Sequence, residues 1–213
     1  AASILTMIAT PFVFQWSPEL AARVMHLLGA RLHHARNLPT THLSNHVMIV
    51  GYGLNGQNLA KVLKENAIDH LILDMNSDRV KQAKHLGHKA HFGDSTHPEV
   101  LKKMGVEKAK MLVVGISDPI STRRIVKTAK ELNPGLTVLV RTRYANEVEE
   151  LAALGASQVI TEEFETSVEI FARVLKEYKV PGNIIQNQID LVRMKGYAMF
   201  RNPSLSIERL ASL

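Results

Sequence analysis

The sequence predicts an α/β fold in which a six-stranded, doubly wound parallel sheet is covered by helices on both faces. Short apolar runs that suit strands alternate with helical segments, and the first run leads into a glycine-rich turn that opens a helix. The chain has 213 residues and no cysteine, which excludes disulfide scaffolds, thiol catalysis and cysteine-ligated metal sites. Its hydrophobic content of 46% excludes a disordered chain.

Strand and helix segments alternate through residues 46–161, the predicted central domain. The first strand, the run that begins at Val47, is continuously apolar, as expected of a strand buried on both faces. The strands that follow are expected at 70–74, 89–92, 110–115, 137–141 and 157–160. The helices between them are expected at 54–64, 76–86, 96–104, 119–132 and 146–154. Right-handed crossovers then favour the strand order 3-2-1-4-5-6, which is Rossmann-like.

The first turn carries the pattern GYGLNG over residues 51–56, between a strand and a helix. In that context Gly51 permits a tight turn, Gly53 lets the backbone approach a phosphate, and Gly56 packs the helix against the strand. The helix N-terminus offers free N–H groups and a partial positive charge to an anion. The residues of this turn that we assign to a nucleotide site are Gly51, Gly53, Leu54, Asn55, Gly56 and Gln57.

An acidic residue, Asp74, ends the second strand. It follows Gly51 at about the 20-residue spacing at which a carboxylate accepts hydrogen bonds from ribose hydroxyls. Its charge repels a 2′-phosphate, so the pattern favours AMP, ADP or NAD(H) over NADP. Met75 and Asn76 follow it and join the predicted site. The alternative is a structural glycine turn with an Asp that caps the next helix.

Polar residues also follow the third, fourth and fifth strands, whose carboxyl ends meet at the same edge of the sheet. These predicted site residues are Asp94, Ser95, Thr96, Ile116, Ser117, Asp118 and Arg141. Arg143 lies two residues after Arg141, so both guanidiniums point to one face and suit a phosphate or a carboxylate. The alternatives are that the hydroxyl and carboxylate side chains cap the following helices, and that the two arginines form a solvated pair.

The central domain lacks an acid–base pair or a long loop that could place a catalytic residue over a nicotinamide. This favours a sensor that binds a nucleotide without transforming it. The net charge of +6 comes from the ends of the chain, since acidic and basic residues balance over residues 47–172. Basic ends favour an anionic membrane surface or an acidic partner, and not nucleic acid.

The N-terminal segment predicts attachment to a membrane. Residues 1–16 suit the end of a truncated transmembrane helix, with Trp16 where an interfacial aromatic is expected; a buried core helix is the alternative. Residues 17–45 predict a basic amphipathic linker. No metal site is predicted there, because no carboxylate lies near the histidines His26, His33, His34, His42 and His46.

Residues 162–200 predict two apolar helices that are separated by a break at 180–182. A finished sheet leaves little surface for them to cover, so we expect them to cross over to a second subunit and form a homodimer. The alternative is that they pack on their own sheet. Residues 201–213 are expected to be a linker to a C-terminal subdomain that the sequence lacks.

Several motifs together resemble the RCK regulatory domain, also called KTN or TrkA N-terminal, over about residues 46–200. They are HVMIVGYGLNGQNLAKVL, ILDMN, HFGDST, LVVGISDP, VLVRTRY and GASQVITEE. The preceding SILTMIATPFVF is similar to the end of the last transmembrane helix of Kef-type antiporters, and the later GYAMFRNPSLSIERL to the approach to an RCK C-terminal subdomain. In that comparison the nucleotide-contacting positions are Gly51, Gly53, Gly56, Asp74, Asp94 and Arg141.

The resemblance implies a dimeric, nucleotide-controlled gate of a potassium/proton antiporter, at the cytoplasmic face of the cell membrane and joined to its transmembrane domain. Leu54 and Asn55 depart from glutathione-gated Kef members, which carry a basic residue in the glycine loop. This departure argues against glutathione control. Two other functions compete: a gating ring of a potassium channel or a Trk/Ktr-type uptake system, and a soluble NAD-dependent oxidoreductase.

Overall fold

The structure is a computed structural model that describes residues 38–195, 197 and 206–207. Its contacts divide the chain into residues 1–40 and 41–213, and the elements described below belong to the second unit. The predicted membrane-helix end at 1–16 lies outside the described residues. So do most of the predicted linkers at 17–45 and 201–213.

In the described residues, six parallel strands form one sheet in the order β3-β2-β1-β4-β5-β6, as the sequence predicted. The strands are β1 (Val47–Val50), β2 (His70–Asp74), β3 (Ala90–Phe92), β4 (Met111–Val114), β5 (Thr137–Thr142) and β6 (Gln158–Thr161). In register, Val50 pairs with Leu73 on one side and with Val114 on the other. The carboxyl ends of these strands therefore lie at one edge of the sheet.

The helices between the strands also follow the prediction, within a few residues at their ends. They are α3 (Leu54–Glu65), α4 (Ser77–His85), α5 (Pro98–Lys103), α6 (Pro119–Leu132) and α7 (Val148–Ala153). Two short 3₁₀ turns, Val106–Lys108 and Ala145–Glu147, were not predicted. Helix α5 begins later than expected, at Pro98, because the backbone and hydroxyl of Thr96 are tied to Asp94 in the preceding loop.

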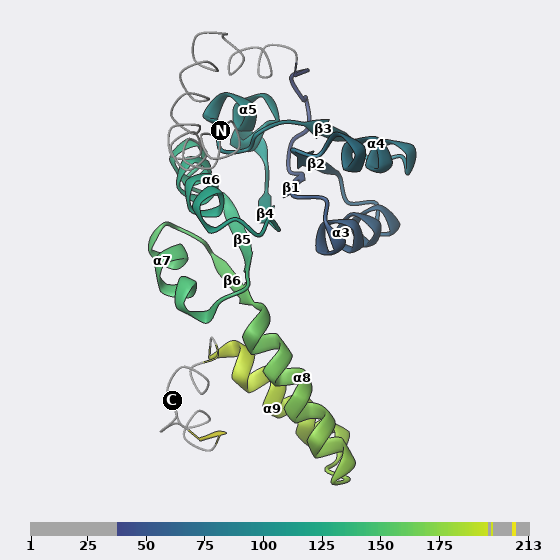
Figure 1. Ribbon diagram of the computed structural model, residues 1–213, viewed down its shortest axis with the longest axis vertical. Coiled ribbons are helices and arrows are strands. Elements are labelled where there is room, and N and C mark those ends of the chain that lie inside the picture. Colours follow the sequence, from purple (N-terminus) through teal and green to yellow (C-terminus); the bar gives the residue numbers. More distant parts are fainter. Residues whose placement is uncertain (1–37, 196, 198–205, 208–213) are drawn as a thin grey trace, which may run out of the picture. The chain divides into compact units, whose positions relative to one another are not determined.

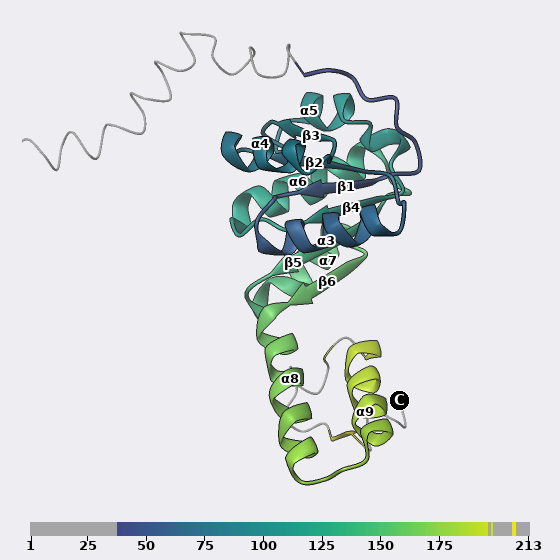
Figure 2. The same cartoon turned by 90° about the vertical axis from the view of Figure 1, so that its right-hand side faces the viewer.

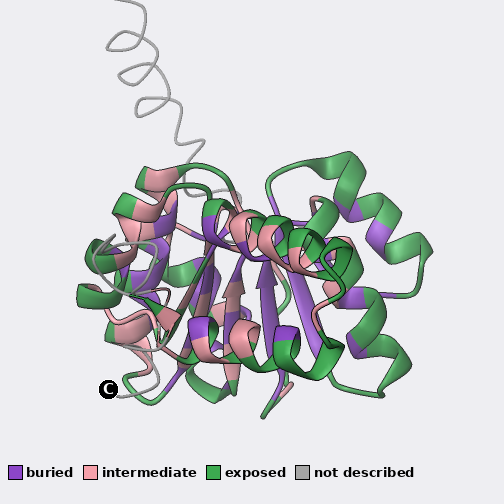
Figure 3. Cartoon of the chain, turned by 90° about the horizontal axis from the view of Figure 1, so that it is seen from below, coloured by how far each residue is buried: buried purple, intermediate pink, exposed green. Residues whose placement is uncertain are grey.

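The sheet is the middle layer of the domain, with helices on both faces (Figure 3). Helices α3 and α4 lie on one side and α5 and α6 on the other, as right-handed crossovers require (Figure 1). On the α3–α4 side, β1 contributes Val47 and Ile49 to a core that also holds Tyr52 of the glycine turn. This buried packing holds the carboxyl ends of β1 and β2 in fixed positions.

Helices α8 (Glu162–Glu177) and α9 (Gly182–Met194) follow β6 and lie side by side (Figures 1 and 2). Arg193 of α9 donates to both carboxylate oxygens of Glu165 on α8, at 3.1 and 2.6 Å, and the Tyr197 hydroxyl donates to the same carboxylate. These hydrogen bonds lower the pKa of Glu165, while burial and Glu165 raise the pKa of Tyr197 to about 12. The predicted helix pair is therefore a hairpin that is held by an ionic cluster.

In the described part of the chain, no helix combines the length and the apolar composition that crossing a bilayer requires. Within the same residues, no three His, Asp or Glu side chains come together as a metal-binding group.

Candidate functional site

A cleft of about 530 Å³ opens at the carboxyl edge of the sheet, where the sequence analysis placed the site. Thirteen of the sixteen predicted residues line it: Gly51, Gly53, Leu54, Asn55, Asp74, Met75, Asp94, Ser95, Thr96, Ile116, Ser117, Asp118 and Arg141. The cleft thus draws on the ends of β1 to β5. Its volume falls within the range of about 300–1,000 Å³ that is typical of small-molecule and cofactor sites.

The glycine turn leaves open space for a ligand at one position and is tightly packed at the other two. Gly51 has a φ of +97°, and a Cβ there would lie 2.9 Å from Ile116 Cγ2. A Cβ on Gly56 would lie 2.1 Å from the carbonyl oxygen of Gly51, so α3 packs directly against the turn. At Gly53 a Cβ would meet nothing within 4 Å. A ligand can therefore approach the backbone closely at Gly53, beside the N-terminus of α3.

Asp74 is nearly buried, and backbone groups orient its carboxylate. Oδ2 accepts a 2.6 Å hydrogen bond from the N–H of Tyr52 in the glycine turn, and Oδ1 accepts a 2.7 Å bond from the N–H of Asn76. Arg79 of α4 lies 3.9 Å from Oδ2. The alternative that Asp74 caps α4 is wrong, because Asn76 is the N-cap and accepts from Asp78 and Arg79. The carboxylate instead connects β1 to β2 at the wall of the cleft.

The loops after β3 and β4 contribute two further carboxylates. Asp94 Oδ1 accepts from the N–H of Thr96 at 2.9 Å and from its hydroxyl at 2.7 Å. Neither Ser95 nor Thr96 caps α5, whose N-cap is His97. Asp118 does cap α6, since it accepts from the N–H of Ser121 at 2.8 Å.

The hydrogen bonds from Ser121 hold the pKa of the Asp118 carboxyl below its ordinary value. The capping alternative is therefore confirmed for Asp118, which still lines the cleft.

Arg141 at the end of β5 is held by two residues of the cleft. Its Nε donates to Glu162 Oε1 at 2.8 Å, its Nη2 contacts the same oxygen, and its Nη1 donates to Ser117 Oγ at 3.0 Å. Glu162 is the first residue of α8 and itself lines the cleft. This part of the site therefore depends on side chains from β5, from α8 and from the loop after β4.

A second hollow of about 460 Å³ adjoins the cleft and shares Ile116, Ser117, Arg141 and Glu162 with it. Arg143 also lines this hollow, and its guanidinium carbon lies 5.7 Å from the centre of the Tyr144 ring. Arg141 at the end of β5 and Arg143 just after the strand thus line one hollow at the sheet edge.

Three predicted site residues, Gly56, Gln57 and Asn76, do not line the cleft. They support it instead: Gly56 packs against Gly51, the Gln57 side chain donates to the carbonyl of Tyr52 at 3.3 Å, and Asn76 caps α4. Two charged residues that line the cleft, Arg79 and Glu162, were not predicted from the sequence. The rule that sites form at strand ends, extended to β6, would have found Glu162, whereas Arg79 follows no such rule.

The residue types around the cleft suit a nucleotide. A buried carboxylate can accept from ribose hydroxyls, open backbone at a helix N-terminus can receive a phosphate, and arginine can pair with another phosphate. In the described residues that line the cleft, the acidic side chains are Asp74, Asp94, Asp118 and Glu162, and the basic ones are Arg79 and Arg141. Acids therefore outnumber bases where phosphates would bind.

The profile of the TrkA-N domain matches residues 47–162, which is the sheet with its helices and the first residue of α8. The chain is 33% identical over 159 residues to a protein named putative K(+) efflux antiporter KefB, from Alkalimonas amylolytica. That match covers 75% of this chain and 24% of the relative, so the chain spans about a quarter of the antiporter's length.

Solved structures show the same fold. The TrkA-N domain of the inner membrane protein ybaL from Escherichia coli is 27% identical, with a TM-score of 0.60 over 62% of this chain and 97% of that one. The Kef CTD of Shewanella denitrificans, solved in an AMP-bound form, is 24% identical, with a TM-score of 0.61 over 72% of this chain and 94% of that one.

Proposed function

The chain belongs to the TrkA-N domain family, and from this premise we propose that it is the nucleotide-binding regulatory domain of a monovalent cation/proton antiporter. In this proposal it binds AMP, ADP or NAD(H) without chemistry and couples their binding to potassium transport. Its place is the cytoplasmic face of the cell membrane, attached to the transmembrane domain of the same full-length protein. The antiporter relative supports the assignment to transport.

One observation carries the ligand class: the oriented carboxylate of Asp74 stands beside the open backbone of Gly53 in one cleft. The N–H groups of Tyr52 and Asn76 leave each Asp74 oxygen a further lone pair, which can accept from a ribose hydroxyl. Gly53 lies at the N-terminus of α3, which suits a phosphate that is linked to that ribose. Because Gly53 follows β1 and Asp74 ends β2, the pairing of these two strands sets the distance between the phosphate position and the ribose position.

The balance of charge in the cleft supports a nucleotide without a 2′-phosphate. A 2′-phosphate would lie against the Asp74 carboxylate, and Arg79, which offsets that charge in part, is half exposed to solvent. We therefore expect NADP to bind more weakly than NAD. The AMP of the Shewanella denitrificans structure makes AMP the first ligand to test.

The test is calorimetric titration of the purified chain with AMP, ADP, ATP, NAD⁺ and NADH, after any nucleotide that co-purifies has been stripped and identified by mass spectrometry. Binding of one of them without turnover supports the regulatory proposal. Change in absorbance at 340 nm with NAD⁺ and a panel of small alcohols and acids would instead support an oxidoreductase. If none of the five nucleotides binds, the proposal is wrong.

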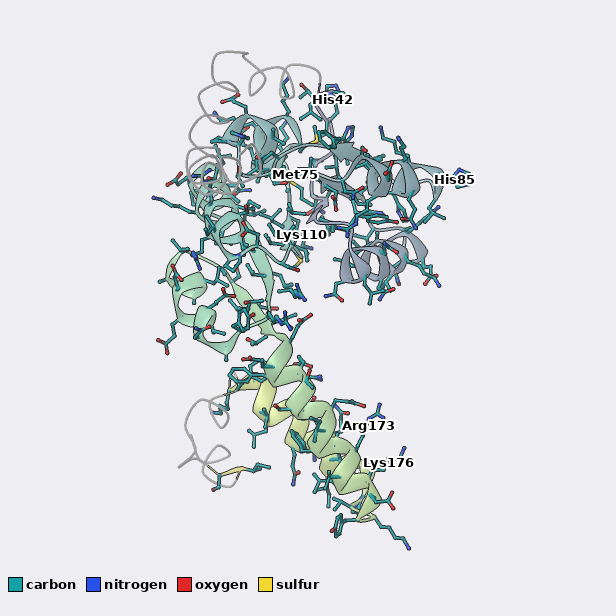
Figure 4. The ribbon with its side chains drawn as sticks, in the orientation of Figure 1. His42, Met75, His85, Lys110, Arg173 and Lys176 are labelled. Carbon is teal, nitrogen blue, oxygen red and sulfur yellow. The ribbon has the colours of Figure 1, made fainter. Side chains whose placement is uncertain are left out.

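We also propose that residues 162–200 form a homodimer through an apolar stripe on α8. Ile170 and Val174 of α8 and Tyr178, the C-cap residue of the helix, recur every four residues and are 59%, 50% and 80% exposed. Such a stripe on a helix face is an expected subunit contact. Arg173 and Lys176 project from the same helix into solvent and mark its charged side (Figure 4).

The dimer is tested by the double variant Ile170→Asp with Val174→Asp. Two carboxylates in the stripe should convert the dimer to a monomer in sedimentation velocity, because charges buried in an interface lose their hydration. Val62→Asp on α3, at a valine that is 52% exposed, is the matched control and should stay dimeric. A double variant that remains dimeric places the interface elsewhere.

A further inference from the structure

Glu162 forms an ion pair with Arg141, the cationic side chain that a phosphate in this part of the cleft would bind. Its Oε1 accepts from Nε of Arg141 at 2.8 Å and also contacts Nη2, while Ser117 Oγ takes a hydrogen bond from Nη1. The Arg141 side chain is 21% exposed and that of Glu162 is 41% exposed, so the pair lies at the wall of the cleft within reach of a ligand.

The position of Arg141 determines which part of a nucleotide it could meet. Strand order places β4 between β1 and β5, and adjacent strands lie about 4.8 Å apart, so Arg141 is about 10 Å across the sheet edge from the glycine turn. Asp74 lies on the other side of that turn, at the end of β2. A nucleotide whose ribose binds Asp74 therefore directs its phosphates past Gly53 toward Arg141.

The negative charge of Glu162 opposes such a ligand. Its carboxylate lines the cleft itself, so a phosphate that approaches Arg141 meets this charge whether or not the ion pair opens. Among the described residues that line the cleft, the other cation is Arg79, which lies on the opposite side, 3.9 Å from Asp74, and cannot take over this role. A phosphate at Arg141 has to compete with Glu162 for the same guanidinium.

We infer that Glu162 sets the affinity of the site, because its carboxylate competes with the terminal phosphate of the nucleotide for Arg141. This inference rests on the proposed function and deepens it. Glu162 is also the first residue of α8. A phosphate that displaces its carboxylate from Arg141 would therefore change a contact at the start of the helix that carries the apolar stripe.

Titration of Glu162→Gln with ADP and with adenosine tests the inference. Removing the competing charge should tighten ADP binding about two- to fivefold, the range expected for a partly exposed ion pair, and should leave adenosine binding unchanged. Glu150→Gln is the matched control: Glu150 of α7 pairs with Arg123 at 3.3 Å and lines neither the cleft nor the hollow, so ADP affinity should not change.

A double-mutant cycle completes the test. In an Arg141→Gln background the further change Glu162→Gln should give a much smaller gain in ADP affinity, because the contested guanidinium is gone. If Glu162→Gln fails to fold by circular dichroism, Glu162→Asp, whose shorter carboxylate withdraws from Arg141, should give the same direction with a smaller gain.

The outcomes separate the two proposals. Unchanged or weaker ADP binding by the Glu162 variant, with wild-type binding intact, overturns the inference and leaves the proposed function standing. If neither the wild-type chain nor the variant binds ADP or adenosine, the inference is wrong; the proposed function is wrong as well only if AMP, ATP, NAD⁺ and NADH also fail to bind the wild-type chain.

Discussion

The two sides of the cleft are built by different means. On the β1–β2 side, backbone N–H groups hold the buried carboxylate of Asp74, and the close packing of Gly56 on Gly51 fixes the turn. On the β4–β6 side, partly exposed side chains hold one another, with Arg141 between Ser117 and Glu162.

This difference indicates which side of the cleft can change its contacts when a ligand binds. Backbone contacts inside a packed core move only if the core moves, whereas a partly exposed ion pair contributes at most about 1 kcal/mol and can exchange partners. We therefore expect the β1–β2 side to act as a rigid receptor for the nucleoside and the β4–β6 side to change its contacts on binding.

The largest expected effect tests the rigidity of the glycine turn. In Gly56→Ala the new Cβ would lie 2.1 Å from the carbonyl oxygen of Gly51, and backbone has to shift to admit it. The free energy of unfolding should fall by about 2–3 kcal/mol in urea denaturation. Gly53→Ala, where nothing lies within 4 Å, should cost less than about 1 kcal/mol but weaken nucleotide binding. Equal stability of the two variants would contradict a tightly packed turn.

The second prediction concerns the ribose contact. Asp74→Ala should weaken AMP or ADP binding by about 1–3 kcal/mol in calorimetric titration, the cost of a lost charge-assisted hydrogen bond. The change also removes the acceptor of the Tyr52 N–H. Asp78→Ala, at an exposed carboxylate of α4 that does not line the cleft, is the control and should bind normally. Wild-type affinity in the Asp74 variant would show that the ribose is held elsewhere.

The third and smallest effect is a dependence of the chain's stability on pH, which arises from histidines in or next to β1 and β3. Burial lowers the pKa values of His46, His88 and His91 from 6.5; nearby His70 and Lys64 add to the effect at His88, and Lys84 adds to it at His91. The unfolded chain therefore takes up protons near pH 6.5 while the folded chain stays neutral to lower pH. The free energy of unfolding should therefore fall as the pH is lowered below 6.5.

Urea denaturation at pH 7.5 and pH 5.5 checks this prediction. His46→Leu should reduce the loss of stability between the two values, because this fully buried ring no longer titrates. His85→Leu, at an exposed histidine of α4 (Figure 4), should lose as much as the wild type. If the wild-type chain has the same free energy of unfolding at pH 7.5 and pH 5.5, the predicted pH dependence is wrong.

The features that could be predicted from the sequence are those that depend on neighbours along the chain. Continuous apolar runs predicted β1 and β2, and the glycine spacing predicted the turn at Gly51 together with the carboxylate at Asp74. These are local features, because strand periodicity and a positive φ are properties of a few consecutive residues. Strand order followed as well, since the handedness of crossovers leaves few arrangements.

The contacts between side chains across the cleft could not be predicted and are visible in the folded chain alone. Folding brought Glu162 from the predicted tail to Arg141, placed Arg79 beside Asp74, and gave the capping of α4 to Asn76. Such pairs join residues from separate elements, so their geometry depends on the twist of the sheet and on where each helix starts. Neither quantity is encoded in a short stretch of sequence, and for this reason most residues that line the cleft were predictable and the ion pairs between its elements were not.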